Sequence, residues 1–313
     1  MYKIIVTIFL LFTSTFLFAQ KGVEDYNKGI QAKTSGKYKD ALKYFTKAID
    51  KDDKNPDFFY HRGLSFYGNK QIQEAYTDFT KAIKLNENFS DAYYQRALLF
   101  SGSSMYMEAI NDLDMAVKYT QNDSLRYQSY ILRSSMKMSV RNFKGGYDDS
   151  KKLYDHDSTS RDAMINMAMC KLEMDNKEVA LTILKRSLSL HANDTMAIMN
   201  VGFVYTQMEQ FDSALVYLSQ SQKLNPRDSY TLSNLSFVKL KLGQVDNALR
   251  DVNTSLLYNP ENSYAYRNRA LIFLAMNEKE KACSDLSTAI KKGFTDKYGE
   301  EVIDLSKKNC QSK

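Results

Sequence analysis

Histidine and cysteine are the side chains here with the most versatile chemistry, and the chain has three of each. His156 and His191 could approach a common edge as metal ligands. However, no cysteine or second carboxylate cluster accompanies them at the spacing of a zinc site. His61 stands apart, and Cys170 lies on an apolar helical stretch, where we expect it to be buried. The sequence therefore predicts solvated junction histidines and no bound metal.

Motifs of catalysis and of cofactor binding are missing from the sequence. It contains no H-E-x-x-H, C-x-x-C or G-x-S-x-G, no P-loop and no G-x-G-x-x-G. The acidic run of Asp50, Asp52 and Asp53 lacks the glycine and the closing glutamate of a calcium loop, so we expect a turn there. These observations predict a protein that is not an enzyme and that carries no cofactor.

The elements that must position these side chains are helices, and residues 195–228 display them most clearly. Small and apolar residues fall at i, i+3, i+4 and i+7 in each half of this stretch, which places them on one helical face. A polar break at 208–210 ends the first helix, and Asn225-Pro226 stops simple continuation of the second. The stretch is therefore a predicted helix hairpin, whose facing residues are Ile198, Val201, Gly202 and Tyr205 in the first half and Phe211, Ala214, Leu215 and Leu218 in the second.

This hairpin recurs along the chain with a period of about 34 residues. Eight repeats are expected within residues 22–292, starting near 22, 56, 90, 127, 161, 195, 229 and 263, with one longer interval where a polar stretch intervenes at 121–126. The fourth repeat is the weakest, because Lys137, Gly145-Gly146 and Ser150 stand at packing positions. It is either a bend in the array or the result of sequence drift. The small residue of the second helix keeps this phase at Ala41, Ala75, Ala109, Gly146, Ala180, Ala214, Ala248 and Ala282.

Helix hairpins of this length and pattern resemble the tetratricopeptide repeat (TPR) family. The chain has no Trp, so Phe or Tyr fills the family's first aromatic position in several repeats. The resemblance implies an all-α, right-handed superhelical solenoid of about eight repeats, with binding rather than catalysis as its function. The family's large, small and proline positions are matched by Phe59, Gly63 and Ala75 in repeat two, and by Gly202, Tyr205, Ala214 and Pro226 in repeat six.

In this family the first helix of each repeat lines a concave groove, and the resemblance places three kinds of side chain there. Tyrosines and amides suit the side chains and backbone of a peptide, and apolar residues add contact area. The alternative is that the asparagines and tyrosines pack between helices. The family's carboxylate clamp is not expected, because Tyr26 and Ile30 stand at its Lys and Asn positions. The candidate groove residues are Tyr26, Tyr60, Tyr94, Asn166, Asn200, Asn234, Asn268, Leu64, Leu98, Phe203 and Phe237.

The N-terminal segment, residues 1–19, is typical of a secretory signal peptide. Lys3 precedes an apolar run from Ile4 to Phe18, which is short for a membrane span of about 20 residues. Cleavage is expected after Ala19, although Leu17 stands where a small residue is usual, and an uncleaved membrane anchor is the alternative. We expect an exported mature chain, periplasmic or extracellular, without a membrane span.

The C-terminal residues 293–313 are not expected to form a ninth repeat. Tyr298, Val302 and Leu305 share one helical face, with acidic residues early and basic residues late, as the helix dipole favours. This pattern predicts a capping helix, and it makes Cys283 and Cys310 a disulfide candidate. Two ideal helical arms would miss each other by about 7 Å, a gap that an irregular start to the second arm closes.

Charge and composition argue against a surface for nucleic acid. The 43 basic and 37 acidic residues are interspersed, and the net charge of +6 falls to about +5 once Lys3 is removed. Three prolines, all at repeat junctions, fit a nearly all-helical chain. We expect a non-catalytic scaffold of the cell envelope that binds a protein or peptide in its groove. A structural component that uses its convex face or its ends is the alternative.

Overall fold

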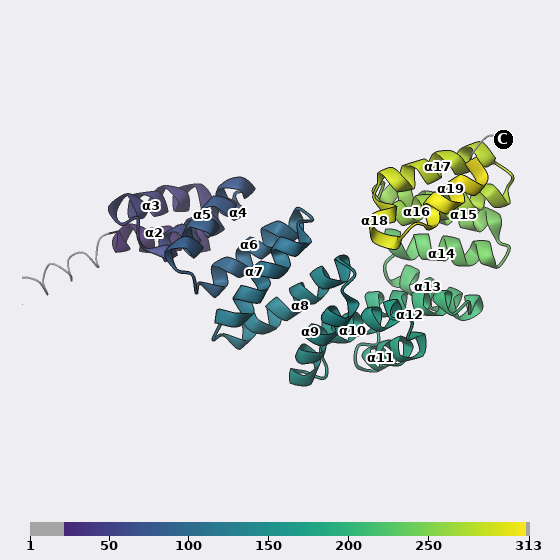
Figure 1. Cartoon of the computed structure of the whole chain (residues 1–313), viewed down its shortest axis with the longest axis horizontal. Helices are drawn as coiled ribbons and strands as arrows, with labels where there is room; N and C mark the ends of the chain where they lie inside the picture. The colour runs from purple at the N-terminus through teal and green to yellow at the C-terminus, as the bar shows by residue number, and fades with distance from the viewer. Residues whose placement is uncertain (1–21, 311–313) are drawn as a thin grey trace, which may run out of the picture. The chain divides into compact units, whose positions relative to one another are not determined.

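The computed structural model describes residues 22–310, and this part of the chain is helical without a β-strand (Figure 1). The predicted signal peptide, residues 1–19, lies outside the described residues. The chain divides into two compact units between Val140 and Arg141, which is within the fourth repeat. The predicted all-α repeat fold is confirmed.

Helix hairpins follow one another along both units. The first unit contains the pairs α2 (Val23–Thr34) with α3 (Tyr38–Lys51), α4 (Pro56–Gly68) with α5 (Ile72–Leu85), and α6 (Ser90–Gly102) with α7 (Tyr106–Tyr119), followed by α8 (Asp123–Ser139). The second unit contains α9 (Phe143–His156), then α10 (Arg161–Glu173) with α11 (Lys177–Leu190), α12 (Thr195–Gln207) with α13 (Phe211–Leu224), α14 (Ser229–Lys241) with α15 (Val245–Tyr258), α16 (Ser263–Ala275) with α17 (Lys279–Lys291), and finally α18 (Phe294–Tyr298) and α19 (Glu301–Cys310).

Each turn between the two helices of a repeat contains one residue with left-handed backbone geometry. This conformation lets the next amide bond back to the end of the first helix, as Gln71 N does to the carbonyl of Phe66 at 2.9 Å. Glycine adopts it freely, whereas other residues pay a steric cost. Only two of the eight turns use glycine: the residues are Gly36, Lys70, Ser104, Arg141, Asp175, Glu209, Gly243 and Asn277.

The small residues of the repeat let its two helices approach closely. A Cβ added to Gly202 of α12 would lie 2.6 Å from Cγ of Leu218 on α13, which is well inside van der Waals contact. The same holds for Gly63 of α4, where a Cβ would lie 2.7 Å from the ring of Phe79. Ala214 on the second helix is fully buried. The first helix therefore needs a small residue wherever a large side chain of the second helix crosses it.

Buried ion pairs also join the two helices in some repeats. Arg96 of α6 donates from Nε and Nη2 to the two oxygens of Asp112 on α7, each at 2.7 Å. These side chains are 16% and 8% exposed, so water screens the pair only weakly. The pair recurs as Arg62 with Asp78 and as Arg269 with Asp285. Repeats five and six have Met167 with Ile183 and Val201 with Tyr217 at the same two positions.

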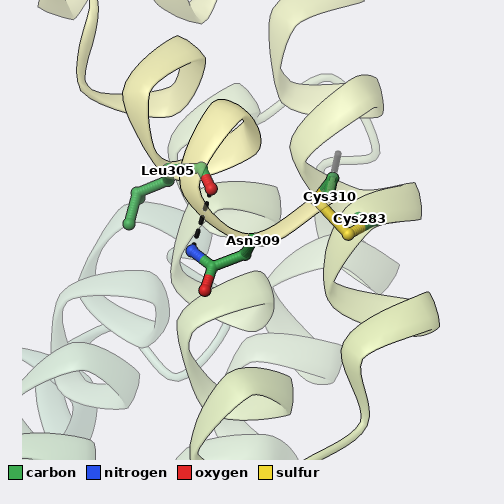
Figure 2. The surroundings of a disulfide bond; sticks show 4 residues. All are labelled: Cys283, Leu305, Asn309 and Cys310. Carbon is green, nitrogen blue, oxygen red and sulfur yellow. Dashed lines mark hydrogen bonds between the residues drawn. A yellow bond between two sulfur atoms is a disulfide. The ribbon is translucent and has the colours of Figure 1, made fainter. Parts of the chain in front are cut away.

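The C-terminal cap consists of two helices rather than one. The helical path breaks at Gly299, where φ is 89°. The next helix, α19, packs on α17 in the way that the first helix of each repeat packs on the second helix of the repeat before it. This break shortens the second arm. Cys310, the last residue of α19, forms a disulfide with Cys283 of α17 (Figure 2). Asn309 of the same helix donates to the carbonyl of Leu305 at 2.8 Å.

Candidate functional site

The second unit contains an open cavity of about 630 Å³, called here the aromatic pocket. The first helices α10, α12, α14 and α16 contribute to its lining, with α18 and α19 at one end. Successive first helices also contact each other, so they form one continuous layer. The aromatic side chains in the lining are Phe203, Phe211, Phe237, Tyr264, Phe294 and Tyr298.

The repeat register explains why these rings gather on one side. Phe203 and Phe237 are one repeat period apart, and so are Tyr264 and Tyr298. Residues one period apart occupy equivalent places in successive repeats and face the same way. The ring of Tyr264 stacks on Phe294 with centroids 6.0 Å apart and lies 5.2 Å from that of Tyr298. The aromatic surface is therefore continuous between α16 and α18.

Arg267 of α16 brings a fixed charge into this aromatic surface. Its side chain is 9% exposed and pairs with Glu301, the first residue of α19, through Nε at 3.1 Å and through Nη2. Nη1 donates to the side-chain oxygen of Asn268 at 2.9 Å. The rings of Phe237 and Tyr264 have their centroids 4.8 and 5.5 Å from the guanidinium carbon. These contacts hold the guanidinium in one orientation.

Tyr298 faces the pocket and is 47% exposed. The surrounding protein nonetheless raises the pKa of its hydroxyl to about 12, mainly through burial, with smaller contributions from Tyr230, Tyr264 and Glu173. The hydroxyl therefore stays protonated at neutral pH and can both donate and accept a hydrogen bond. Tyr298 thus combines an accessible ring with a neutral polar end.

The charged side chains of the pocket are balanced in sign. The pair of Arg267 and Glu301 is internally neutralised, and Lys177 lies 3.6 Å from Asp175. Such a lining does not select a strongly acidic or strongly basic ligand. The basic members are Arg141, Lys177, Lys241 and Arg267, and the acidic members are Glu173, Asp175, Glu209 and Glu301.

The candidate groove residues of the second unit divide between the pocket and the packing of the helices. Phe203 and Phe237 line the pocket. Asn268 is fully buried and donates to the backbone carbonyl of Ser233 on α14 at 2.9 Å. A fully buried side chain cannot contact a partner, so Asn268 has the packing role that the sequence left open. Asn200 is 7% exposed, and Asn166 and Asn234 are partly buried.

The three candidate tyrosines of the first unit are half-buried and have aromatic neighbours. Tyr26 of α2 lies 5.1 Å from the ring of Phe58 on α4. Tyr60 lies 4.9 Å from the ring of Phe89, and burial raises the pKa of its hydroxyl. Tyr94 packs against the same cluster of buried residues as Tyr60. The structure thus gives each tyrosine a packing contact and leaves part of its surface exposed. The candidates Leu64 and Leu98 are likewise partly buried.

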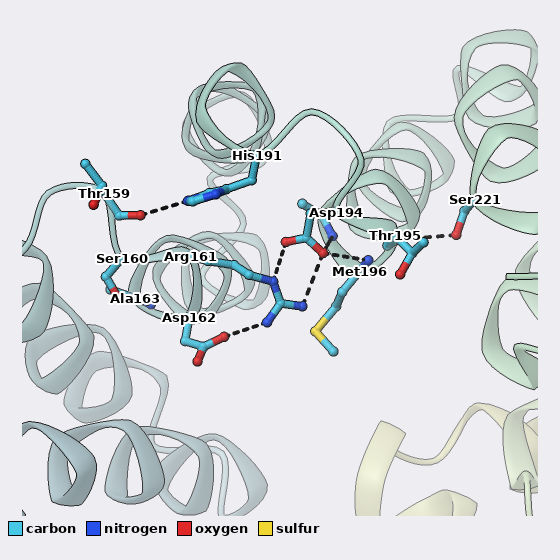
Figure 3. A network of polar contacts seen from close by, with 11 residues as sticks. Thr159, Ser160, Arg161, Asp162, Ala163, His191, Asp194, Thr195, Met196 and Ser221 are labelled. Carbon is cyan, nitrogen blue, oxygen red and sulfur yellow. Dashed lines mark hydrogen bonds and ion pairs between the residues drawn. The ribbon is translucent and has the colours of Figure 1, made fainter. Parts of the chain in front are cut away.

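His191 belongs to a polar network that joins successive repeat junctions (Figure 3). It donates from Nε2 to the carbonyl of Thr159 at 2.9 Å. Nearby, Arg161 pairs with Asp194, which also accepts from the first amides of α12. Burial alone would raise the pKa of Asp194, but these hydrogen bonds outweigh it and lower the pKa. Through its bond to Thr159, His191 connects the loops of two successive repeat junctions.

Among residues 22–310, no group of three or more His, Cys, Asp or Glu side chains is arranged to hold a metal ion.

Several pocket residues were not among the candidates from the sequence. They include Tyr264, Phe294, Tyr298 and Glu301. One signal was available, because Glu301 follows Arg267, and Tyr298 follows Tyr264, by one repeat period. The capping segment therefore continues the register of the repeats.

None of the helices described in residues 22–310 has the length and apolar character that a membrane span requires.

Comparisons with known proteins agree with this architecture. Two family models described as tetratricopeptide repeat match residues 26–93 and 238–293, and residues 162–194, together half of the chain. No curated protein matches the chain.

Solved structures with similar folds share little sequence with this chain. A tetratricopeptide repeat protein from Parabacteroides merdae is 17% identical with a TM-score of 0.51, over 92% of this chain and 99% of that one. A chain of the APC/C hetero-tetramer Cut9-Hcn1 is 16% identical with a TM-score of 0.57, over 77% of this chain and 47% of that one. MamA from Desulfovibrio magneticus RS-1 is 18% identical with a TM-score of 0.50, over 56% of this chain and 97% of that one.

Proposed function

Because this chain belongs to the tetratricopeptide repeat family, whose fold is that of a protein–protein interaction scaffold, we propose that it is a non-catalytic adaptor of the cell envelope. In this proposal an extended segment of a partner protein lies in the aromatic pocket of the second unit. The observation that carries the proposal is the pocket itself. Its volume of about 630 Å³ suits a few side chains of a peptide, and six aromatic residues are among those that line it.

The chemistry of the lining indicates the kind of segment that fits. The rings of Phe203 and Phe237 offer apolar contact area, and Tyr298 adds a ring with a neutral hydroxyl. Charges of both signs surround them. We infer a segment with an apolar or aromatic side chain between polar or oppositely charged neighbours, because a run of one charge would meet repulsion somewhere along this lining.

The envelope setting rests on the sequence of residues 1–19 and on the cysteine pair. A basic start followed by a short apolar run is typical of exported proteins, and disulfides persist in oxidising compartments. Cell fractionation followed by mass spectrometry of the N-terminus tests this setting. An exported protein that begins at Gln20 would agree with it, whereas a cytosolic protein that retains residues 1–19 would contradict it.

A crosslinked pull-down from envelope extract tests the binding site. Tyr298→Ala removes a half-exposed ring from the pocket, and the matched control Leu257→Ala removes a side chain that is 77% exposed on α15 and does not line the pocket. We expect a partner that the wild type and Leu257→Ala retain and that Tyr298→Ala loses. If no variant captures any protein, the adaptor proposal fails.

A second candidate function is a structural component that uses the outer helices. Val216 of α13 is 66% exposed and Leu257 of α15 is 77% exposed, and both lie on second helices. A contact surface on the outer helices would use exposed apolar residues of this kind. In the same pull-down, loss of the partner in Leu257→Ala with retention in Tyr298→Ala would favour this candidate over the pocket.

A further inference from the structure

The C-terminal helix α19 supplies one removable part of the aromatic pocket. Its first residue, Glu301, lines the pocket and pairs with Arg267. The preceding α18 contributes Phe294 and Tyr298. Phe294 is fully buried against the last repeat, so α18 is firmly attached. Gly299 separates the two helices with a φ of 89°, which a glycine adopts without strain. The segment that can move is therefore α19, with Gly299 as its hinge.

α19 packs on α17 as a first helix packs on the preceding repeat, but no second helix follows to cover it among residues 22–310. Val302 is its one buried residue among residues 301–310, and Leu305 is only partly buried. An open hollow of about 190 Å³ lies against the helix, lined by Ile290, Ile303 and Cys310 among others. An isolated helix of 10 residues is also marginal in water. These contacts alone are a weak attachment.

The disulfide provides the remaining attachment, at the end of α19 that lies away from the hinge. It joins Cys310, the last residue of the helix, to Cys283 of α17 across a sequence separation of 27 residues (Figure 2). Closing a loop of this length strongly restricts the detached states of the segment. Hinge and disulfide together hold α19 at both ends, so that Glu301 stays beside Arg267.

We propose that the disulfide between Cys283 and Cys310 is a redox-controlled latch on the aromatic pocket. A dithiol reductant breaks the Sγ–Sγ bond by supplying two electrons and two protons. The products are two cysteine thiols and the oxidised, cyclic disulfide of the reductant. In the reduced protein α19 detaches about Gly299 and takes Glu301 with it.

Release of α19 changes the charge of the pocket as well as its shape. Arg267 loses the carboxylate at Nε and Nη2, while Asn268, Phe237 and Tyr264 still hold its guanidinium in place. The balanced lining gains one uncompensated positive charge and loses one wall. The consequence for a partner rests on the proposed function: a segment that fits the closed pocket binds the reduced protein more weakly.

Hydrogen–deuterium exchange on the full chain tests the latch without any partner. Wild-type protein is compared before and after reduction with dithiothreitol and alkylation by iodoacetamide. We expect two alkylated thiols, because Cys170 is fully buried. Exchange in peptides covering residues 301–310 is expected to rise by roughly several hundred-fold, the factor that loss of such a loop constraint implies. Peptides from α12 and α14 should not change.

Variants separate the latch from a general loss of structure. Cys283→Ser with Cys310→Ser should reproduce the fast exchange of the reduced protein, and Cys170→Ala should leave it slow under oxidising conditions. Equal protection of residues 301–310 in the oxidised and reduced wild type would overturn the proposal, since α19 would then be held by its other contacts.

The same samples distinguish the latch from the proposed function. If α19 is released on reduction but no partner is captured in either state, the latch holds and the adaptor proposal fails. If a partner is captured equally in both states while α19 stays protected, the latch fails and the adaptor proposal stands.

Discussion

Replacing Arg96 by Met while Asp112 remains is expected to lower the free energy of unfolding of the first unit by about 3–5 kcal/mol. The reason is the carboxylate that stays behind. Asp112 is 5% exposed and receives both of its short hydrogen bonds from Arg96. Without the guanidinium, a buried charge has neither a counter-ion nor water around it.

The chain itself provides the control for this experiment. Met167 and Ile183 occupy the same two repeat positions in repeat five, so the double variant Arg96→Met with Asp112→Ile transplants an apolar pair that this fold already accommodates. Removing both charges leaves no unpaired carboxylate. The double variant is therefore expected to lie within about 1 kcal/mol of the wild type.

The pH dependence of the single variant follows from the same carboxylate. Burial raises the pKa of Asp112, and the Arg96 guanidinium opposes that effect. In Arg96→Met the folded-state pKa stands above the unfolded value, so the folded protein binds a proton more readily. The penalty is then full at neutral pH and shrinks as pH falls through the raised pKa.

Urea unfolding followed by circular dichroism measures these free energies, and hydrogen exchange in α6 and α7 locates the loss. The reasoning is refuted if the double variant is as unstable as Arg96→Met. In that case the loss of stability would come from the lost packing of the Arg96 side chain rather than from the unpaired charge of Asp112. A loss below about 1 kcal/mol in the single variant would also refute it.

Three further predictions concern stability. Nδ1 of His61 lies 3.1 Å from the ammonium of Lys33. Burial, together with the charge of Lys33, lowers the pKa of the His61 imidazole to about 4. Between about pH 6.5 and pH 4 this imidazole is therefore protonated in the unfolded chain but not in the folded protein. The wild type should therefore lose about 2 kcal/mol relative to His61→Gln on acidification over that range, with allowance for the exposed part of the ring, and parallel urea midpoints for the two proteins would contradict this. Ser104 has φ of 59°, so Ser104→Gly should stabilise by about 0.5–1 kcal/mol, and Gly36→Ala, at a φ of 70° in open space, should destabilise similarly. Thermal unfolding measures both, and equal melting temperatures would argue against a strained turn. Gly202→Val forces a side chain against Leu218 and should cost about 2–3 kcal/mol in urea unfolding, whereas Gly102→Ala, where a Cβ meets nothing within 4 Å, should cost less than about 0.5 kcal/mol.

Residue spacing within short segments of the sequence predicted most of the fold. The hairpin of α12 and α13 follows from the spacing of Val201, Gly202, Ala214 and Leu218, because residues at i, i+3, i+4 and i+7 share a helical face wherever they occur. Gly202 lies so close to Leu218 that a larger side chain would not fit. This explains why a small residue recurs at the same position in the first helix of every repeat. The break of the cap at Gly299 agrees with the irregular start that the sequence required if Cys283 and Cys310 were to meet. The glycine alone did not predict it, since a glycine inside an apolar pattern is also compatible with one continuous helix.

The candidate site was predicted only in part. Phe203 and Phe237 line the pocket as the family's pattern implies, but Asn268 turned out to be buried. Asn268 faces α14, and its hydrogen bond to Ser233 depends on the distance between two successive first helices. A periodicity cannot supply that distance. The sequence could therefore name the face of the helix, but not whether the next helix covers it.

What the sequence by itself determined is the repeating unit and its register, because helix period, turn residues and small positions are properties of short segments. The tertiary structure alone decided which residues meet in the pocket. Glu301 reaches Arg267, and Glu173 of α10 lines the same pocket as Tyr298 of α18. Such meetings depend on the small rotation between neighbouring repeats, summed over several of them. That sum is set by side-chain packing at every interface, so no single segment of the sequence contains it.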